Sequence, residues 1–235
     1  TGTAASFHHP QGVAVDFSGN VYVADNATHL IRKITSAGVV TTLAGSGSSG
    51  STNGTGTAAS FSYPNGLAID DDGNVYVVDS NNHLIRKITP SGVVTTFAGS
   101  GEWGISNGNA LSATFGYPTD IAIDEYNNFY VGQNSYGLVR KISSNGSVTT
   151  LAGTQNGYVD GIGAEARFQY PSGLAVDGIG NVYVADRDNH LIRKITPLGE
   201  VTTLAGSGSE GSTNGTVTAA SFNHPSGVTV DASGN

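Results

Sequence analysis

The chain of 235 residues contains no cysteine and no methionine, and only 12% of its residues are charged. Without cysteine it can form no disulfide framework and no thiolate metal site. No apolar run approaches the roughly 20 residues that a membrane-spanning helix needs, so we expect no membrane span. This composition favours a secreted or cell-surface protein, and we expect a bacterial source.

Positive charge is scarce as well. The formal net charge is −8, and the chain has ten Lys and Arg residues. Most of these form one repeated dipeptide, at Arg32-Lys33, Arg86-Lys87, Arg140-Lys141 and Arg193-Lys194. Binding to phosphates requires clustered positive charge, so the composition argues against a nucleic-acid partner. We expect each repeated Arg to pair with a carboxylate such as Asp25, Asp79 or Asp186, in its own or a neighbouring blade.

What the chain has is a repeat of about 54 residues. Prolines recur at positions 10, 64, 118, 171 and 225, and each closes an Ala-x-Phe-x-x-Pro segment. In the first repeat, short β-branched runs bounded by Gly, Asn and Asp predict four strands. Their expected ranges are Gly12–Asp16, Val21–Asp25, His29–Thr35 and Val39–Leu43. Four antiparallel strands repeated around an axis are typical of a propeller blade, whereas a solenoid usually has shorter coils.

An Asp-x-x-Gly-Asn motif links the first two strands of most repeats, at Asp16, Asp70, Asp177 and Asp231. In the third repeat, after Asp124, the Gly is replaced by Asn127, which also tolerates positive φ. We interpret these Asp residues as turn caps rather than as a carboxylate ring for a metal. The loop that begins at Asp70 fails the calcium pattern, because Val75 stands at its sixth position. We therefore expect no metal and no cofactor.

The repeat also carries a family signature. Asn82-His83-Leu84 and Asn189-His190-Leu191 are the Asn-His-Leu triplet that names NHL repeats. Thr28-His29-Leu30 is a near match, and Tyr136-Gly137-Leu138 departs from it. The chain thus resembles the NHL-repeat β-propeller family over essentially its whole length. The resemblance implies a propeller, typically six-bladed in that family, and implies no single activity.

We expect one all-β domain, or a fragment of one, covering residues 1–235. Its repeat units are roughly 1–54, 55–108, 109–161, 162–215 and a partial unit 216–235. The first twenty and the last twenty residues copy the same part of the repeat. This duplicated inner-strand segment favours a piece of a larger ring, with a homo-oligomer that completes the propeller as the alternative.

Histidines and tyrosines are the first candidates for a site. One His per repeat, at 29, 83 and 190, indicates turn chemistry rather than a metal cluster. A second position, just before the innermost strand, carries His9, Tyr63, Tyr117, Tyr170 and His224. Such groups could line the mouth of a channel and stack on a sugar. The alternative is that each packs between blades beside its Pro.

Departures from the repeat are the second group of candidates. They gather in the third and fourth repeats and are expected on the face formed by the long connections. Aromatic and Arg side chains are enriched at binding hot spots, although drift of a repeat explains them equally well. The candidate ligand-binding residues are Trp103, Gln133, Tyr136, Tyr158 and Arg187.

These patterns predict a non-catalytic extracellular binding or scaffold module that contacts protein or carbohydrate and could self-assemble. One alternative is a lyase or hydrolase with its site at the channel mouth. Another is an engineered or truncated repeat protein, because the chain opens in mid-repeat. The spacing of Ser, His and carboxylate residues indicates no catalytic group.

Overall fold

A computed structural model describes residues 4–231 and 233–235 of the chain. They form four antiparallel sheets joined by short turns and single-turn 3₁₀ helices. Each sheet is a propeller blade, which confirms the predicted all-β fold class. The blades fall into two compact units: unit 1 is residues 1–106 and 110–117, and unit 2 is residues 107–109 and 118–235. None of the described residues form a helix long and apolar enough to cross a membrane.

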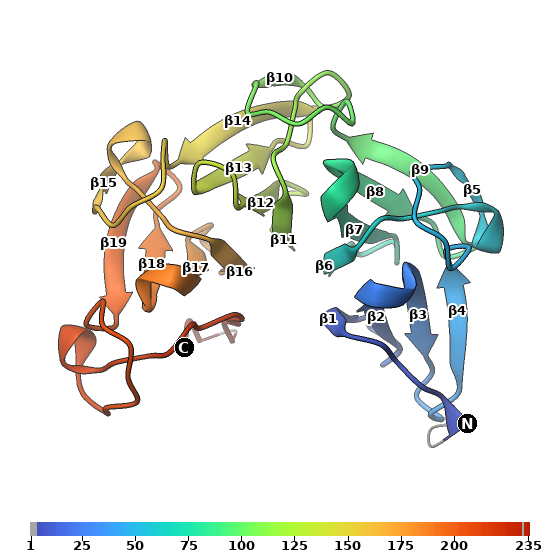
Figure 1. Ribbon diagram of the computed structural model, residues 1–235, viewed down its shortest axis with the longest axis horizontal. Coiled ribbons are helices and arrows are strands. Elements are labelled where there is room, and N and C mark those ends of the chain that lie inside the picture. The colour runs from blue at the N-terminus through green and yellow to red at the C-terminus, as the bar shows by residue number, and fades with distance from the viewer. Residues whose placement is uncertain (1–3, 232) are drawn as a thin grey trace. The chain divides into compact units, whose positions relative to one another are not determined.

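Unit 1 contains the first two sheets (Figure 1). The strand order of the first is β1-β2-β3-β4, and that of the second is β5-β9-β8-β7-β6. The strands are β1 (Pro10–Val15), β2 (Val21–Asp25), β3 (Leu30–Ile34), β4 (Val40–Ala44), β5 (Gly54–Thr55), β6 (Pro64–Ile69), β7 (Val75–Asp79), β8 (Leu84–Ile88) and β9 (Val93–Ala98). The 3₁₀ helices are η2 (Asn26–Thr28), η3 (Gly56–Ala58) and η4 (Ser80–Asn82).

Unit 2 contains the other two sheets, with orders β10-β14-β13-β12-β11 and β15-β19-β18-β17-β16. The strands are β10 (Gly108–Asn109), β11 (Pro118–Ile123), β12 (Phe129–Gln133), β13 (Leu138–Ile142), β14 (Ser147–Ala152), β15 (Gly161–Ile162), β16 (Pro171–Val176), β17 (Val182–Asp186), β18 (Leu191–Ile195) and β19 (Glu200–Ala205). The 3₁₀ helices are η5 (Gly163–Glu165), η6 (Arg187–Asn189) and η7 (Val217–Ala219).

The long connections also form strands that the sequence does not predict. The first three each cross to the far edge of the next sheet and add a two-residue strand there. Thr55 of β5 pairs with Val93 of β9, and Gly161 of β15 pairs with Val201 of β19. The added strand covers part of a sheet edge whose backbone groups would otherwise be open for association.

The third strand of the first repeat also starts one residue later than predicted. His29, His83 and His190 have φ values of 57° to 58° and close the short helix before the strand. They are therefore turn residues, and β3 begins at Leu30.

The duplicated segment at the C-terminal end lies beside β16. Ser172 Oγ donates to the carbonyl oxygen of Pro225 at 3.2 Å, and Asp231 closes its turn by accepting from the Asn235 amide at 2.8 Å. The described residues of this segment thus occupy an inner-strand position without forming a paired strand.

In each unit, apolar side chains of one sheet pack against the next sheet. In unit 1, Ile31 of β3 belongs to one buried cluster with Phe61 and Val77. In unit 2, Val139 of β13 belongs to a cluster with Phe168 and Val184. All six side chains are fully buried, so the alternating strand pattern is explained by this face-to-face packing.

A buried arginine sits at the centre of each complete blade. Arg86 of β8 and Asp79 of β7 are fully buried, and their charged atoms are 2.8 Å apart. Arg86 also donates to the Ser60 carbonyl at 3.2 Å and to Asn53 Oδ1 at 2.7 Å. Asp79 accepts from the Ser62 amide at 2.7 Å. The ion pair therefore ties two strands to the incoming connection, which confirms the predicted Arg–Asp pairing.

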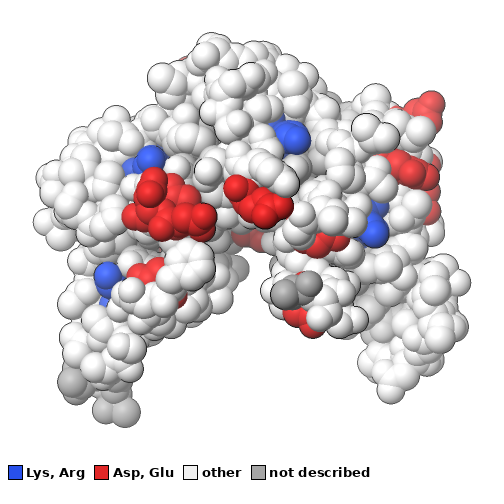
Figure 2. Space-filling view, turned by 180° about the vertical axis from the view of Figure 1, so that it is seen from behind, with Lys and Arg blue, Asp and Glu red and all other residues white. Residues whose placement is uncertain are grey.

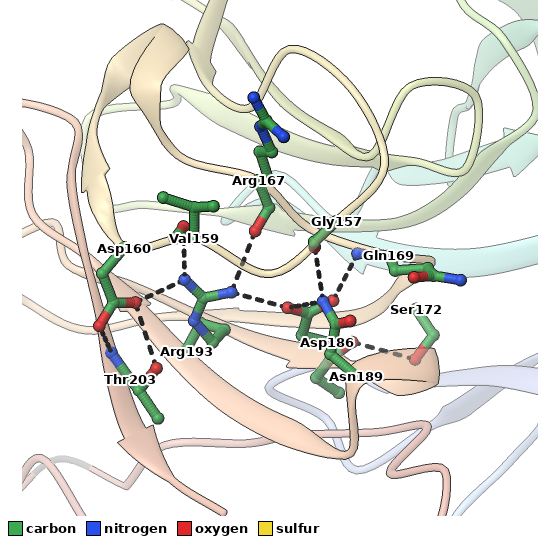
Figure 3. Close-up of polar contacts among 11 residues, drawn as sticks. Gly157, Val159, Asp160, Arg167, Gln169, Ser172, Asp186, Asn189, Arg193 and Thr203 are labelled. Atoms are coloured by element: carbon green, nitrogen blue, oxygen red, sulfur yellow. Dashed lines mark hydrogen bonds and ion pairs between the residues drawn. The ribbon is translucent and has the colours of Figure 1, made fainter. Parts of the chain in front are cut away.

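The same arrangement recurs in unit 2 (Figure 3). Arg193 bonds Asp186 at 2.8 Å and Asp160 at 2.5 Å. It also donates to the carbonyls of Val159 and Arg167 at 3.0 and 3.1 Å. Four acceptors from three chain segments thus surround one guanidinium group.

Two blades vary this contact. In the first, Arg32 is 15% exposed and its distance to Asp25 is 3.6 Å. In the third, Gln133 replaces the Asp, and Arg140 donates to Gln133 Oε1 at 3.2 Å and to Asn107 Oδ1 at 2.8 Å.

Replacing Asp79 with Ala should lower the free energy of unfolding by about 3–5 kcal/mol, because a buried guanidinium loses its partner. Urea denaturation of Asp79→Ala and wild type measures the difference. Asp71→Ala, at an exposed turn position, is the matched control and should change stability by less than about 0.5 kcal/mol. Equal, small effects of both substitutions would contradict the role assigned to the pair.

Candidate functional site

The repeated histidine connects neighbouring repeats. His83 Nδ1 accepts a hydrogen bond from the Tyr117 amide at 3.3 Å, and the two rings meet edge to face at 4.7 Å. His29 makes the same contact with Tyr63, and His190 with His224. Burial lowers the pKa of His83, although Glu102 opposes this shift, so the ring stays a neutral acceptor at neutral pH. This geometry confirms the predicted structural role.

The five predicted channel-mouth positions share one backbone conformation. His9, Tyr63, Tyr117, Tyr170 and His224 all have positive φ, between 47° and 60°. The left-handed conformation turns the backbone just before each Pro. Tyr63 and Tyr117 remain 45% exposed while their ring edges contact a histidine. Packing between repeats and exposure to a ligand are therefore compatible at these positions.

The third repeat replaces the histidine with Gly137, at a φ of 56°. A Cβ atom there would lie 2.1 Å from the Phe168 carbonyl oxygen, so only glycine permits this close approach. Tyr170, the next residue of the channel-mouth set, lies instead under the guanidinium group of Arg187, 5.1 Å from the ring centre.

Arg187 belongs to a polar cluster of unit 2. It forms an ion pair with Asp188 at 3.0 Å. His224 Nε2 lies 3.9 Å from Asp188 Oδ1, and His224 Nδ1 lies 2.7 Å from Asn223 Oδ1. We call Tyr170, Arg187, Asp188, Asn223 and His224 the Arg187 cluster.

The cluster is accessible, since the side chains of Arg187, Asp188 and His224 are 39%, 32% and 43% exposed. The turn itself does not require these charges, because the second repeat forms the same 3₁₀ helix with Ser80 and Asn81 in place of Arg187 and Asp188.

The structure places the remaining candidates separately. Trp103, in unit 1, is 51% exposed, and its main chain forms an isolated parallel β-bridge with Phe115. Tyr136 is 44% exposed and Tyr158 is 52% exposed, the latter 5.5 Å from the Arg193 guanidinium group. Gln133 is fully buried and accepts from Arg140, so its side chain presents no surface to a ligand in this conformation.

The predicted turn caps are confirmed. Asp70 Oδ1 accepts from the Asn74 amide at 2.8 Å, and Asp70 Oδ2 accepts from the Tyr76 hydroxyl at 3.0 Å. The tyrosine contact recurs in the other blades, at Tyr22, Tyr130 and Tyr183. Sequence reasoning missed it, although a Tyr stands six residues after Asp16, Asp70, Asp124 and Asp177.

Sequence reasoning also missed Asp120, which replaces the Gly of the Pro-x-Gly motif on β11. Its Oδ2 accepts from the Leu174 amide of β16 at 2.8 Å, so it links the two inner strands of unit 2. Burial raises the pKa of Asp120 to about 7, partly opposed by the hydrogen bonds from Leu174 and Ile121. Within the described part of the chain, no group of His, Asp and Glu is placed to hold a metal ion.

Blades of four or five antiparallel strands, joined by a repeated histidine contact, define a β-propeller repeat protein. The family model for the NHL repeat matches residues 61–88 and 168–195, and that for the teneurin NHL domain matches residues 1–55. The chain belongs to the NHL-repeat β-propeller family.

Two curated relatives align with 98% of the chain. One is Protein SUPPRESSOR OF QUENCHING 1, chloroplastic, from Arabidopsis thaliana, at 30% identity over 24% of that protein. The other is NHL repeat-containing protein 2 from Bos taurus, at 31% identity over 37% of that protein. The chain therefore spans about a quarter to a third of these relatives' length.

Among solved structures, an auxiliary nutrient binding protein from Bacteroides thetaiotaomicron has a similar fold. The TM-score is 0.74 at 18% identity, covering 97% of this chain and 56% of that one. At this low identity, the similarity shows only that the two proteins share a fold.

The carboxyl group of Asp120 gives a pH-dependent prediction. Its folded pKa lies above the value of about 3.9 in an unfolded chain, so the folded state holds the proton more tightly. The stability that this proton provides is full below about pH 4 and is lost as pH rises towards 7. As pH rises over this range, the free energy of unfolding of Asp120→Asn should increase by about 1–2 kcal/mol relative to that of wild type. Parallel pH profiles from urea denaturation would contradict the assignment.

Proposed function

We propose that this chain is a non-catalytic binding module that works outside the cell and recognises carbohydrate through the Arg187 cluster. The observation that carries the proposal is the half-exposed contact among Tyr170, Arg187, Asp188 and His224. Planar donors and acceptors of this kind suit the hydroxyl groups of a sugar, and an aromatic ring suits its apolar face.

Main-chain hydrogen bonds hold the turn that carries Arg187 and Asp188. The Arg187 and Asp188 amides donate to the carbonyls of Tyr170 and Gln169 at 3.2 and 3.1 Å. The turn is thus fixed by main-chain bonds, which leaves the side chains available for a ligand. Preorganisation of this kind reduces the entropy that binding must overcome.

Two similarities support the proposed role and location. The first repeat matches the teneurin NHL domain model, and the fold resembles that of a protein named for nutrient binding. The acidic, cysteine-free composition is compatible with secretion or display on a cell surface. A protein surface as ligand is the alternative that the binding experiment separates from carbohydrate.

The test is a panel of immobilised oligosaccharides followed by titration calorimetry with the best soluble sugar. The variants Arg187→Ser and Asp188→Asn install the residues of the second repeat, so the turn should survive. Each should weaken binding about tenfold or more, the loss expected at a hot spot, with less than about 1 kcal/mol change in stability.

The matched control is Ser80→Asn, at the position in unit 1 that corresponds to Arg187. It should bind as wild type does. Absence of sugar binding across the panel, or binding that is unaffected by Arg187→Ser, would contradict the proposal.

A further inference from the structure

A second feature of unit 2 lies at the other end of its strands. The Arg187 cluster follows the end of β17, where Asp186 closes the strand, whereas the turns after β11 and β16 lie at the opposite strand ends. Between these two turns is a groove of about 330 Å³. The side chains that line it include Asp124, Glu125, Tyr126, Lys141, Asp177 and Ile179.

A glycine opens this groove. Gly178 lines it, and a Cβ atom at this position would meet nothing within 4 Å. Its φ is not in the left-handed region, so the backbone does not require glycine here. The first three repeats carry Phe17, Asp71 and Glu125 at this turn position. The fold therefore accepts large side chains there, and the fourth repeat leaves the space free.

The two turns also expose apolar surface on the groove. Tyr126 is 69% exposed and Ile179 is 78% exposed. The same turn position carries Ser18, Asp72 and Ser233 in the other repeats, so the turn does not need these larger side chains. Exposed aromatic and aliphatic groups that flank a hollow are a common mark of a binding surface.

The charge of the groove is negative. Asp124, Glu125 and Asp177 face one cation, Lys141, whose ammonium group already lies 5.5 Å from the Tyr130 ring centre. Burial raises the pKa of Asp177, but hydrogen bonds from Asn181, Ile179 and Tyr183 outweigh it and lower the pKa. Asp177 is therefore ionised at neutral pH.

Figure 2 draws the molecule from behind relative to Figure 1, and acidic side chains form red patches on the face it shows, whereas the blue basic groups are scattered. In Figure 1 the orange helix that follows β17 is drawn in front of its sheet.

We propose that this groove binds an arginine side chain of an extended basic peptide segment on a partner protein. The guanidinium plane stacks on the exposed ring of Tyr126 and pairs with the Glu125 carboxylate, while Ile179 contacts the methylene stem. Arginine suits this site better than lysine because its planar group stacks on an aromatic ring and bonds a carboxylate through two parallel donors. The site is independent of the Arg187 cluster.

The test uses the ¹⁵N-labelled chain and the pentapeptide acetyl-GRGRG-amide, with acetyl-GKGKG-amide and acetyl-GEGEG-amide as comparisons. The arginine peptide should give saturable amide shifts confined to residues 124–128 and 177–180. The lysine peptide should bind at least about threefold more weakly, and the glutamate peptide should give no shifts. Shifts that do not saturate, or that lie elsewhere, would overturn the proposal.

Variants locate the site. Gly178→Phe fills the groove with the side chain that the first repeat carries and should abolish the shifts, while Asp71→Phe, the same change in unit 1, should leave them intact. Tyr126→Ser and Glu125→Gln should each weaken binding about fivefold or more. These two changes preserve the turn, so they test the site even if Gly178→Phe does not fold. Wild-type affinity in the folded Gly178→Phe protein, or in both of the other variants, would overturn the proposal.

Discussion

The buried arginine of the second, third and fourth blades, Arg86, Arg140 and Arg193, is the group on whose contacts the rest of the structure depends. A guanidinium group removed from water is costly unless charge and hydrogen bonds surround it. At Arg86 these come from Asp79, from the incoming connection and from the carbonyl that precedes Phe61. The hydrogen bonds that Arg86 requires thus fix where the connection crosses the sheet. It also brings Phe61 into the apolar cluster shared by the two sheets of unit 1.

The same requirement accounts for what the repeat can change. The hydrogen-bond partners of the repeated arginine and of the turn-capping Asp recur with little variation. By contrast, positions that face solvent in the turns differ freely, as Ser80 and Arg187 show at one site and Asp71 and Gly178 at another. Binding chemistry can therefore be added to one repeat without altering the blade. Unit 2 carries such additions at both strand ends: an Arg, Asp and His cluster at one end and an acidic groove at the other.

Much of the fold could be predicted from the sequence because the repeat presents the same pattern several times. The strand at Val21–Asp25 matches its predicted range, and the pairing of Arg86 with Asp79 follows from two charges that recur together. The added strand at Gly54–Thr55 could not be predicted, because a strand of two residues, one of them glycine, is too short to show the alternating pattern of a β-strand. The start of β3 at Leu30 was also missed, because residue type alone does not show that His29 has a positive φ.

The candidate site was predictable only in part. Arg187 was expected on the face of the long connections and Tyr170 at the channel mouth, and the two side chains are in contact. Gln133 was chosen as a departure from the repeat, yet its side chain is buried beside Arg140. Asp120 and the groove near Gly178 depend on the distance between repeats that are more than 50 residues apart in sequence, which a single pattern does not encode. The predicted self-association stays a prediction.

The ion pair and the connection it holds form one cooperative unit with the sheet. Amide hydrogen exchange of Ser62 and Gln169 tests this most directly, because these loop amides donate to Asp79 and Asp186 at 2.7 Å. Both amides should exchange only through global unfolding, with the same free energy as the central-strand amides. Exchange of either amide at the rate of an exposed loop would contradict it.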